Sequence, residues 1–152
     1  MLFRSALARA ETLTQQQGVA PGAYSLQAAI AACHAQAQEA AQTDWPRIVT
    51  LYDALAQVAP SPVVELNRAV AIGMAFGPAA ALPLVDALAA EPALAQYPWL
   101  PSVRADLLAR LGRHSEAADD FLRAAEQTRN ARERAFLQSR AEAERARAAG
   151  AR

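Results

Sequence analysis

Three turn residues recur along the chain at a nearly constant interval. Thr43, Gly77 and Gly112 are 34 and 35 residues apart, and each separates two stretches of helical composition. The second stretch of each pair repeats the interval at two further positions: Tyr52, Val85 and Phe121, then Leu55, Leu88 and Ala124. Such an interval indicates a repeat protein, in which each pair of helices buries its apolar face against the neighbouring pairs.

The clearest copy of the repeat is the segment LARLGRHSEAADDFLRAA, residues 108–125. It places Gly112 in the turn, a small residue at Ala117, an aromatic ring at Phe121 and a second small residue at Ala124. This order is typical of tetratricopeptide repeats. Small residues let two antiparallel helices approach closely, and the ring fills the space between successive pairs. The pattern is fair in the first copy and weak in the second.

The composition favours helix throughout. The 152 residues include 41 alanines but only 6 glycines and 9 prolines, and alanine is the best helix former. We therefore expect an all-α fold, in which a single domain over residues 1–152 forms a tetratricopeptide-like right-handed superhelix of antiparallel helix hairpins. The expected hairpins are residues 24–58, 62–90 and 100–128, and the expected capping helices are residues 2–16 and 130–148.

Prolines and capping residues predict where the helices begin. Thr43 or Asp44 caps a helix with Pro46 in its first turn, and Ser61 precedes another that begins at Pro62. Residues 91–101 carry three prolines, which predicts a loop or at most a single turn. The remaining expected boundaries are a helix over 24–41, a start at Pro78, an end at Leu111, a start at Ser115 and a division at Asn130.

Charge and cysteine content limit the setting of the chain. Its 15 basic residues, all arginine, balance 15 acidic ones, so no global field draws it to nucleic acid or to a membrane. The single cysteine, Cys33, excludes an internal disulfide and fits a reducing compartment. There is no apolar run of membrane-spanning length and no leader pattern. The expected location is cytoplasmic, without membrane contact.

No residue pattern points to catalysis, a metal or a cofactor. Cys33 and His34 are adjacent and so diverge on a helix, which favours a packed cysteine beside a surface histidine over a nucleophile–base pair. His114 is expected in a solvated turn, and the neighbours Asp119 and Asp120 also diverge. Glycine-rich phosphate loops, nucleophile elbows and metal-ligand spacings do not occur. We expect a protein that is not an enzyme and has no cofactor.

The C-terminal segment has two interpretations. Residues 129–152 carry seven arginines and three glutamates, which could form a nucleic-acid contact. Several of these charges lie three or four positions apart with opposite sign, as in a solvated, self-paired helix, and no aromatic residue follows Phe136 to stack on bases. The favoured interpretation is a capping helix packed through Phe136 and Leu137, whose half after Arg140 has nothing large to bury.

Three segments resemble a family of bacterial transcription proteins. They are SLQAAIAACHA (25–35), DWPRIVTLYDALAQVAPSPVVELNRAVAI (44–72) and LPSVRADLLARLGRHSEAADDFLRAAEQTRNARERAFL (100–137). Over residues 22–140 the chain resembles the C-terminal tetratricopeptide-like extension of RNA polymerase sigma factors of the extracytoplasmic-function (ECF) type. The resemblance implies a role in transcription initiation through protein contacts. The promoter-reading domains of the family precede this segment and have no counterpart here, so DNA would be reached only through them.

The resemblance and the repeat register together suggest partner-binding residues. The concave wall of a superhelix is expected to expose Asn67, Met74, Asp106 and Arg110. Other candidates are Arg68, Asn130, Arg134 and the aromatic Trp99. For each polar candidate, and above all for Asn67 and Arg68, the alternative is a structural hydrogen bond between helices. Trp45 and Tyr52 occupy positions that normally go inside, whereas Tyr97 and Trp99 are either tucked under the proline-rich loop or left as anchors.

The expected partner is protein: the sigma factor's own promoter-binding domains, core RNA polymerase or a regulator. A second hypothesis is a small-molecule sensor with a ligand pocket between helices. A buried pocket ringed by convergent polar groups would favour the sensor, and an open polar groove would favour the protein-binding domain.

Overall fold

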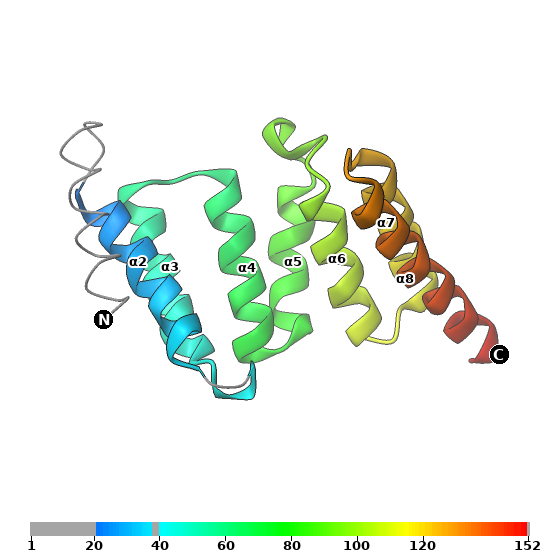
Figure 1. The fold of residues 1–152 in the computed structure, drawn as a ribbon, viewed down its shortest axis with the longest axis horizontal. Helices are drawn as coiled ribbons and strands as arrows, with labels where there is room; N and C mark the ends of the chain where they lie inside the picture. The colour runs from blue at the N-terminus through cyan, green and yellow to red at the C-terminus, as the bar shows by residue number, and fades with distance from the viewer. Residues whose placement is uncertain (1–20, 38–39, 152) are drawn as a thin grey trace. The chain divides into compact units, whose positions relative to one another are not determined.

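The computed structural model describes residues 21–37 and 40–151, and within these ranges every regular element is helical (Figure 1). The prediction of an all-α fold is therefore confirmed, while the helix predicted at 2–16 lies outside the described residues. The longer helices are α2 (Pro21–Gln36), α3 (Trp45–Val58), α4 (Pro62–Phe76), α5 (Pro78–Leu88), α6 (Trp99–Arg110), α7 (His114–Gln127) and α8 (Ala131–Gly150). Single 3-10 turns occur at Ala40–Gln42 and Pro92–Leu94.

Asp44 and Ser61 begin helices as predicted, and Asn130, predicted only as a division between helices, is the cap of α8. The Asp44 carboxylate accepts a hydrogen bond from the Arg47 amide at 3.2 Å, and the Ser61 hydroxyl accepts one from the Val64 amide at 3.1 Å. The Asn130 side chain accepts from the amides of Arg132 and Glu133 at 2.9 and 3.1 Å. Each bond satisfies a backbone donor that the first turn of a helix leaves unpaired.

Two turn glycines have the backbone conformation that requires glycine. Gly77 follows α4 with φ of 97°, and Gly112 follows α6 with φ of 79°. Residues with a Cβ rarely adopt such angles, because the Cβ clashes with the backbone. The short turn after α6 makes α6 and α7 antiparallel neighbours (Figure 1).

Several predicted boundaries were wrong. Helix α2 begins at Pro21 instead of Tyr24 and ends at Gln36 instead of Ala41, and α6 begins at Trp99, inside the segment predicted as a loop. The α6 helix tolerates Pro101 because this residue lies in the first turn, where a missing N–H leaves no hydrogen bond unmade. Helix α7 begins one residue early, at His114.

The contacts within the chain divide it into two compact units, Met1–Ala75 and Phe76–Arg152. The prediction of one domain remains a prediction, as does the hairpin 62–90, which includes the boundary. In the first unit α2 packs against α3, and the buried side chains include Ile30, Ile48, Leu55 and Leu66.

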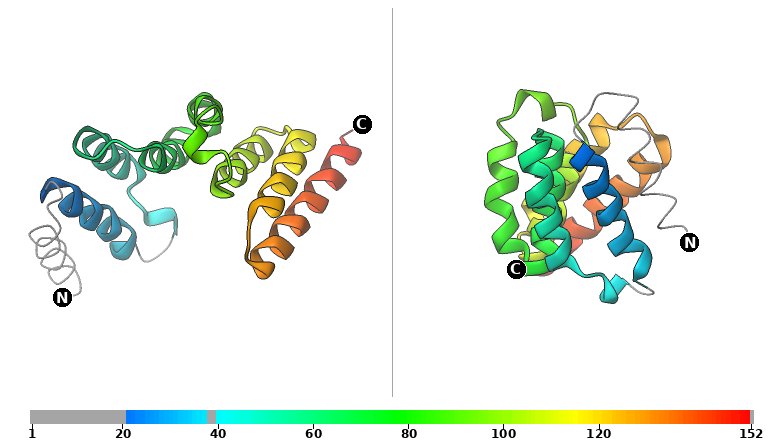
Figure 2. Two further views of the ribbon diagram at one scale, coloured as in Figure 1. Left: turned by 90° about the horizontal axis from the view of Figure 1, so that it is seen from above. Right: turned by 90° about the vertical axis from the view of Figure 1, so that its left-hand side faces the viewer.

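In the second unit each helix packs against the next along the chain, from α5 to α8. Helices α7 and α8 lie side by side in Figure 1 and in the left view of Figure 2. Ala117 and Ala124 are fully buried and Phe121 is 2% exposed, as the repeat pattern of this hairpin predicted. None of the helices in the described ranges is long and apolar enough to cross a bilayer.

Candidate functional site

A groove in the first unit is lined by residues of three helices. Its volume is about 340 Å³. Helix α2 contributes four residues spaced along one face, α3 contributes two and α4 three; they are Gln27, Ile30, Ala31, His34, Tyr52, Leu55, Val63, Val64 and Asn67. We call this the α2–α4 groove. It brings Asn67, a predicted site residue, together with eight residues that the sequence analysis had not selected as site residues.

Three polar side chains of the groove make no hydrogen bond to the described part of the protein. Among the described residues, Gln27, Tyr52 and Asn67 have no hydrogen-bond partner for their side chains, and their polar atoms remain in reach of solvent. Burial raises the pKa of Tyr52 above its ordinary value of 10.0, which keeps the phenol protonated and neutral over a wide pH range. His34 is exposed and meets the Trp45 ring edge-on, with centroids 5.2 Å apart.

Arg68, the neighbour of Asn67, forms ion pairs within the protein. Its guanidinium lies 2.5 Å from the Asp53 carboxylate on α3 and 3.6 Å from Glu65 on its own helix. The hydrogen bond to Asp53 raises the pKa of Arg68 against the opposing effect of burial. Of the two interpretations of Arg68, the structure therefore favours the bond between helices.

Two predicted apolar candidates are exposed. Met74 on α4 is 48% exposed, and Trp99 is 43% exposed at the first residue of α6. Trp99 is therefore not tucked away, although it belongs to a helix and not to the predicted loop. Tyr97, two residues earlier, is half-buried.

Asp106 and Arg110 lie one turn apart on α6 and so share a face of that helix. Arg110 is exposed, and about half of the Asp106 side chain is accessible. The Arg140 guanidinium of α8 approaches the Asp106 carboxylate to 3.4 Å. We call Asp106, Arg110 and Arg140 the α6 charged face.

Asn130 and Arg134 hold the turn between α7 and α8. Asn130 is the N-cap of α8. The Arg134 guanidinium donates to the carbonyls of Thr128 and Ala125 at 3.0 and 3.4 Å. These contacts give both residues a structural role in addition to the predicted partner-binding one.

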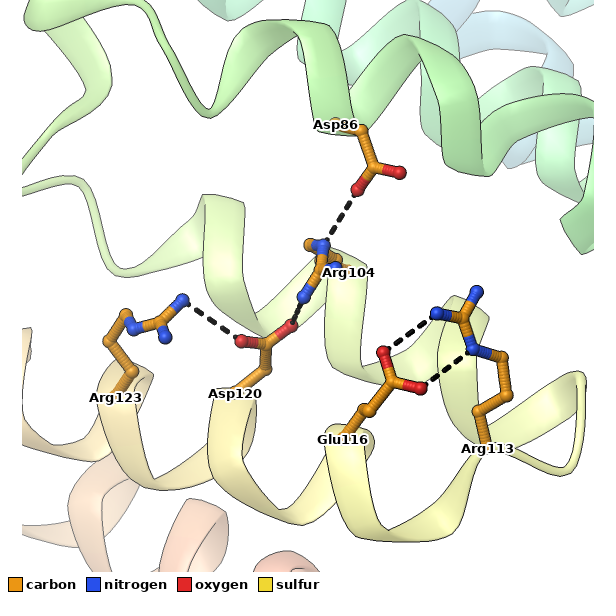
Figure 3. Close-up of polar contacts among 6 residues, drawn as sticks. All are labelled: Asp86, Arg104, Arg113, Glu116, Asp120 and Arg123. Carbon is orange, nitrogen blue, oxygen red and sulfur yellow. Dashed lines mark hydrogen bonds and ion pairs between the residues drawn. The ribbon is translucent and has the colours of Figure 1, made fainter.

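An ion-pair network around the buried Asp120, which the sequence analysis missed, joins α5, α6 and α7 (Figure 3). The Arg104 guanidinium lies 2.7 Å from Asp86 and 2.5 Å from Asp120, whose second oxygen meets Arg123 at 3.0 Å. Asp120 is 2% exposed. Burial lowers the pKa of Arg104, but its bonds to Asp86 and Asp120 outweigh this and raise it.

A cavity of about 100 Å³ beside this network includes Arg104, Arg123 and Gln127 in its lining. Asp86 and Asp120 together balance the charges of the two guanidiniums, so the cavity offers a ligand no unpaired charge. The Gln127 amide nitrogen donates to the Ala95 carbonyl at 3.3 Å, which leaves its buried oxygen without a partner among the described residues.

A second buried carboxylate corrects the predictions for His114 and for the end of α8. Glu144 is fully buried, shares a hydrogen bond of 2.6 Å with Nδ1 of His114 on α7, and accepts one from Arg147 at 2.5 Å. His114 is thus a contact between α7 and α8 and not a solvated turn residue. The half of α8 after Arg140 buries both Ala141 and Glu144.

The aromatic residues near α8 also differ from the prediction. Phe136 is 60% exposed, whereas Leu137 is buried as predicted. The Arg140 guanidinium stacks over the ring of Phe121, 4.6 Å from its centroid. Arg134, Arg140 and Arg147 are all engaged within the protein, which reduces the charge that α8 could offer to phosphates.

The described part of the chain brings no three His, Cys, Asp or Glu side chains close enough to hold a metal ion. Cys33 is buried beside the exposed His34, in agreement with the prediction for this pair.

Comparison with known proteins identifies one informative similarity. The chain is 48% identical over 117 residues to a protein of Rhizobium meliloti (strain 1021) that is described as uncharacterized. The alignment covers 77% of this chain but 27% of the relative, so the chain spans about a quarter of the length of that protein. No protein-family model matches the chain, and no solved structure is similar to it.

Proposed function

We propose that this chain is the regulatory C-terminal extension of an ECF sigma factor, a tetratricopeptide-like right-handed superhelix that acts in transcription initiation by binding protein. The observation that carries the proposal is the geometry of the α6–α7 hairpin. Gly112 has a positive φ, Ala117 and Ala124 are fully buried, and the buried Phe121 ring lies beneath Arg140 of α8. These are the roles that the repeat pattern requires, and such scaffolds present extended surfaces to protein partners.

The relative from Rhizobium meliloti supports a modular role. Its similar segment makes up 27% of its length, so in that protein the domain is joined to other parts. A C-terminal extension of a sigma factor would have the same organisation. The proposed partners are the sigma factor's own promoter-binding domains, core RNA polymerase or a regulator, and the proposed location is the bacterial cytoplasm.

The α6 charged face is the proposed contact surface. It contains the Asp106 carboxylate and the guanidinium groups of Arg110 and Arg140, and the side chains of Asp106 and Arg110 are accessible. Complementary charges on a partner would fix the orientation of the complex and speed association. Trp99 on the same helix adds an exposed aromatic ring, the kind of side chain that contributes most to protein interfaces.

A pull-down with matching sigma-factor domains and core polymerase tests the proposal. The double variant Asp106→Asn/Arg110→Gln should reduce capture at least fivefold. The control Asp119→Asn/Arg129→Gln makes the same two chemical changes at exposed positions of the second unit and should bind as the native chain does. Equal capture of both variants would place the contact elsewhere, and no capture of the native chain would reject the proposal.

The second candidate function, a small-molecule sensor, is favoured by the α2–α4 groove. Its volume falls in the range of small-ligand sites, and apolar residues make up most of its lining, together with a few convergent polar groups. A sensor and a protein-binding domain are compatible in one chain, since the groove and the α6 charged face belong to different units.

A further inference from the structure

The α2–α4 groove has the size of a site for a small molecule. Along α2 its lining residues run from Gln27 to His34, a length of about 10 Å at the rise of a helix. Two turns of a bound helix would occupy on the order of 1,000 Å³, whereas the groove holds about 340 Å³. A partner helix would therefore extend beyond the groove, while a compact ligand would fit whole.

The floor of the groove favours an apolar ligand body. Ile30 and Leu55 are 6% and 1% exposed and form its buried part, and Val63 is 40% exposed at its side. Covering Val63 and the neighbouring Val64 would remove apolar surface from water, which stabilises a complex by roughly 25 cal/mol for each Å² covered.

The three unpaired polar groups require hydrogen bonds from whatever binds. The carboxamides of Gln27 and Asn67 each donate and accept, and the neutral Tyr52 hydroxyl does the same. A ligand without polar atoms would bury these groups unpaired, at a cost of about 1–3 kcal/mol each. A ligand that carries a carboxamide or hydroxyl would satisfy them.

Charge selects further among ligands. None of the nine lining residues is Asp, Glu or Arg. The nearest charges along the lining helices are Asp53, Glu65 and Arg68, and Arg68 pairs with both carboxylates. A charged ligand would lose hydration in the groove and gain no opposite charge.

We infer that the α2–α4 groove binds a small uncharged molecule with an apolar body and a carboxamide or hydroxyl group that both donates and accepts hydrogen bonds. This inference rests on the second candidate function, the small-molecule sensor, and names the chemical class of its ligand; it does not depend on the protein-binding surface in the second unit.

Three probes of similar shape and different charge test the inference: benzamide, benzoate and benzylamine. Each is titrated into the full ¹⁵N-labelled chain at neutral pH, and amide shifts are followed by NMR. Benzamide should give saturable shifts confined to residues of α2, α3 and α4, with an affinity at least fivefold above that of either charged probe.

Variants of the groove sharpen the test. Asn67→Leu keeps the size of the side chain and Tyr52→Phe removes only a hydroxyl, and each should weaken benzamide binding at least threefold. Gln57→Leu makes a similar change at an exposed position of α3 outside the groove and should have no effect. The melting temperature of each variant is measured. If Asn67→Leu does not fold, the affinity of Tyr52→Phe for benzamide is the result that decides the test.

Several outcomes would overturn the inference: equal affinity for the three probes, shifts elsewhere in the chain, or binding unchanged in both groove variants. Absence of probe binding, together with shifts of the same amides on addition of sigma-factor domains, would assign the groove to a protein segment. No partner protein enters the probe titrations, so the ligand site and the proposed function can fail independently.

Discussion

Arg104 illustrates how much a single side chain can hold together. It lies on α6 and pairs with carboxylates of α5 and α7, one of which, Asp120, is almost fully buried. Removing one partner of a buried pair leaves a charge without compensation, which costs far more than the loss of an exposed pair. The position of Arg104 therefore makes it a key residue for the stability of the second unit.

Arg104→Ala is expected to lower the free energy of unfolding by roughly 2–4 kcal/mol, since Asp120 keeps only its exposed partner Arg123. The matched control is Arg113→Ala, which removes an equally close pair with Glu116 on the surface. The control should leave the urea midpoint unchanged, because exposed pairs contribute little. Equal midpoints for the two variants would show that the network does not stabilise the fold.

Tyr52 should make stability depend on alkaline pH. Burial raises the pKa of Tyr52 in the folded chain, so above pH 10 the folded state binds more protons than the unfolded state. Linkage then makes the free energy of unfolding fall as the pH rises past 10. Tyr52→Phe should lose less stability than the native chain between pH 9 and pH 11 in parallel urea titrations. Identical curves would show that folding does not raise the pKa of Tyr52.

The residues that the sequence analysis missed have a common feature. Asp119 and Asp120 are adjacent and identical in type, yet Asp119 is exposed and Asp120 is buried against Arg104. Only the packing of α7 on α6 distinguishes them, and a pattern of residue types along one helix does not contain that information. His114 was misassigned for the same reason, since its partner Glu144 is 30 residues away.

At the scale of the helix, caps formed by nearby residues were predicted correctly, whereas features that depend on the packing of several helices were not. Asp44 and Ser61 cap helices as predicted, because a cap bonds to amides two or three residues ahead, and Asn130, predicted only as a division between helices, is also a cap. The start of α6 was missed because prolines suggested a loop, although Pro101 is compatible with a first turn. The groove could not be predicted, since its lining comes from three helices over 40 residues of sequence.

The last helix pair contains one buried and one exposed phenylalanine, Phe121 and Phe136. Phe121→Ala should destabilise the chain by about 3–5 kcal/mol, because the ring is 2% exposed and its loss leaves a cavity. Phe136→Ala should cost less than about 1 kcal/mol, because that ring is 60% exposed. Thermal melts of the two variants compare them directly. A larger loss for Phe136→Ala would contradict the packing of α7 and α8.

Truncation tests the end of α8, where sequence and structure disagree. Removal of residues 141–152 takes away Ala141 and the buried Glu144 and leaves His114 without its partner. We expect the melting temperature to fall by roughly 5–10 °C, as for a loss of about 2–3 kcal/mol in a chain of this size. Removal of residues 149–152 is the control and should change it little. An unchanged melt after the longer truncation would show that this half of α8 is dispensable.

For the whole molecule, we propose different tasks for the two units. The first contains a neutral groove suited to a small ligand, and the second contains a stack of helices with an accessible charged face. The sequence resemblance to ECF sigma-factor extensions is the basis for our proposal that both tasks serve transcription initiation. The internal pairing of Arg134, Arg140 and Arg147 argues against α8 as an arm for nucleic acid.

One pair of titrations tests the central claim, that this chain binds protein and not nucleic acid. The fluorescently labelled chain is titrated with matching sigma-factor domains and core polymerase, and separately with duplex DNA at low salt. We predict saturable binding to at least one of the proteins and no saturable binding to the duplex. Binding to the duplex that weakens steeply with added salt, together with no binding to either protein, would contradict the account, because phosphate contacts release counterions.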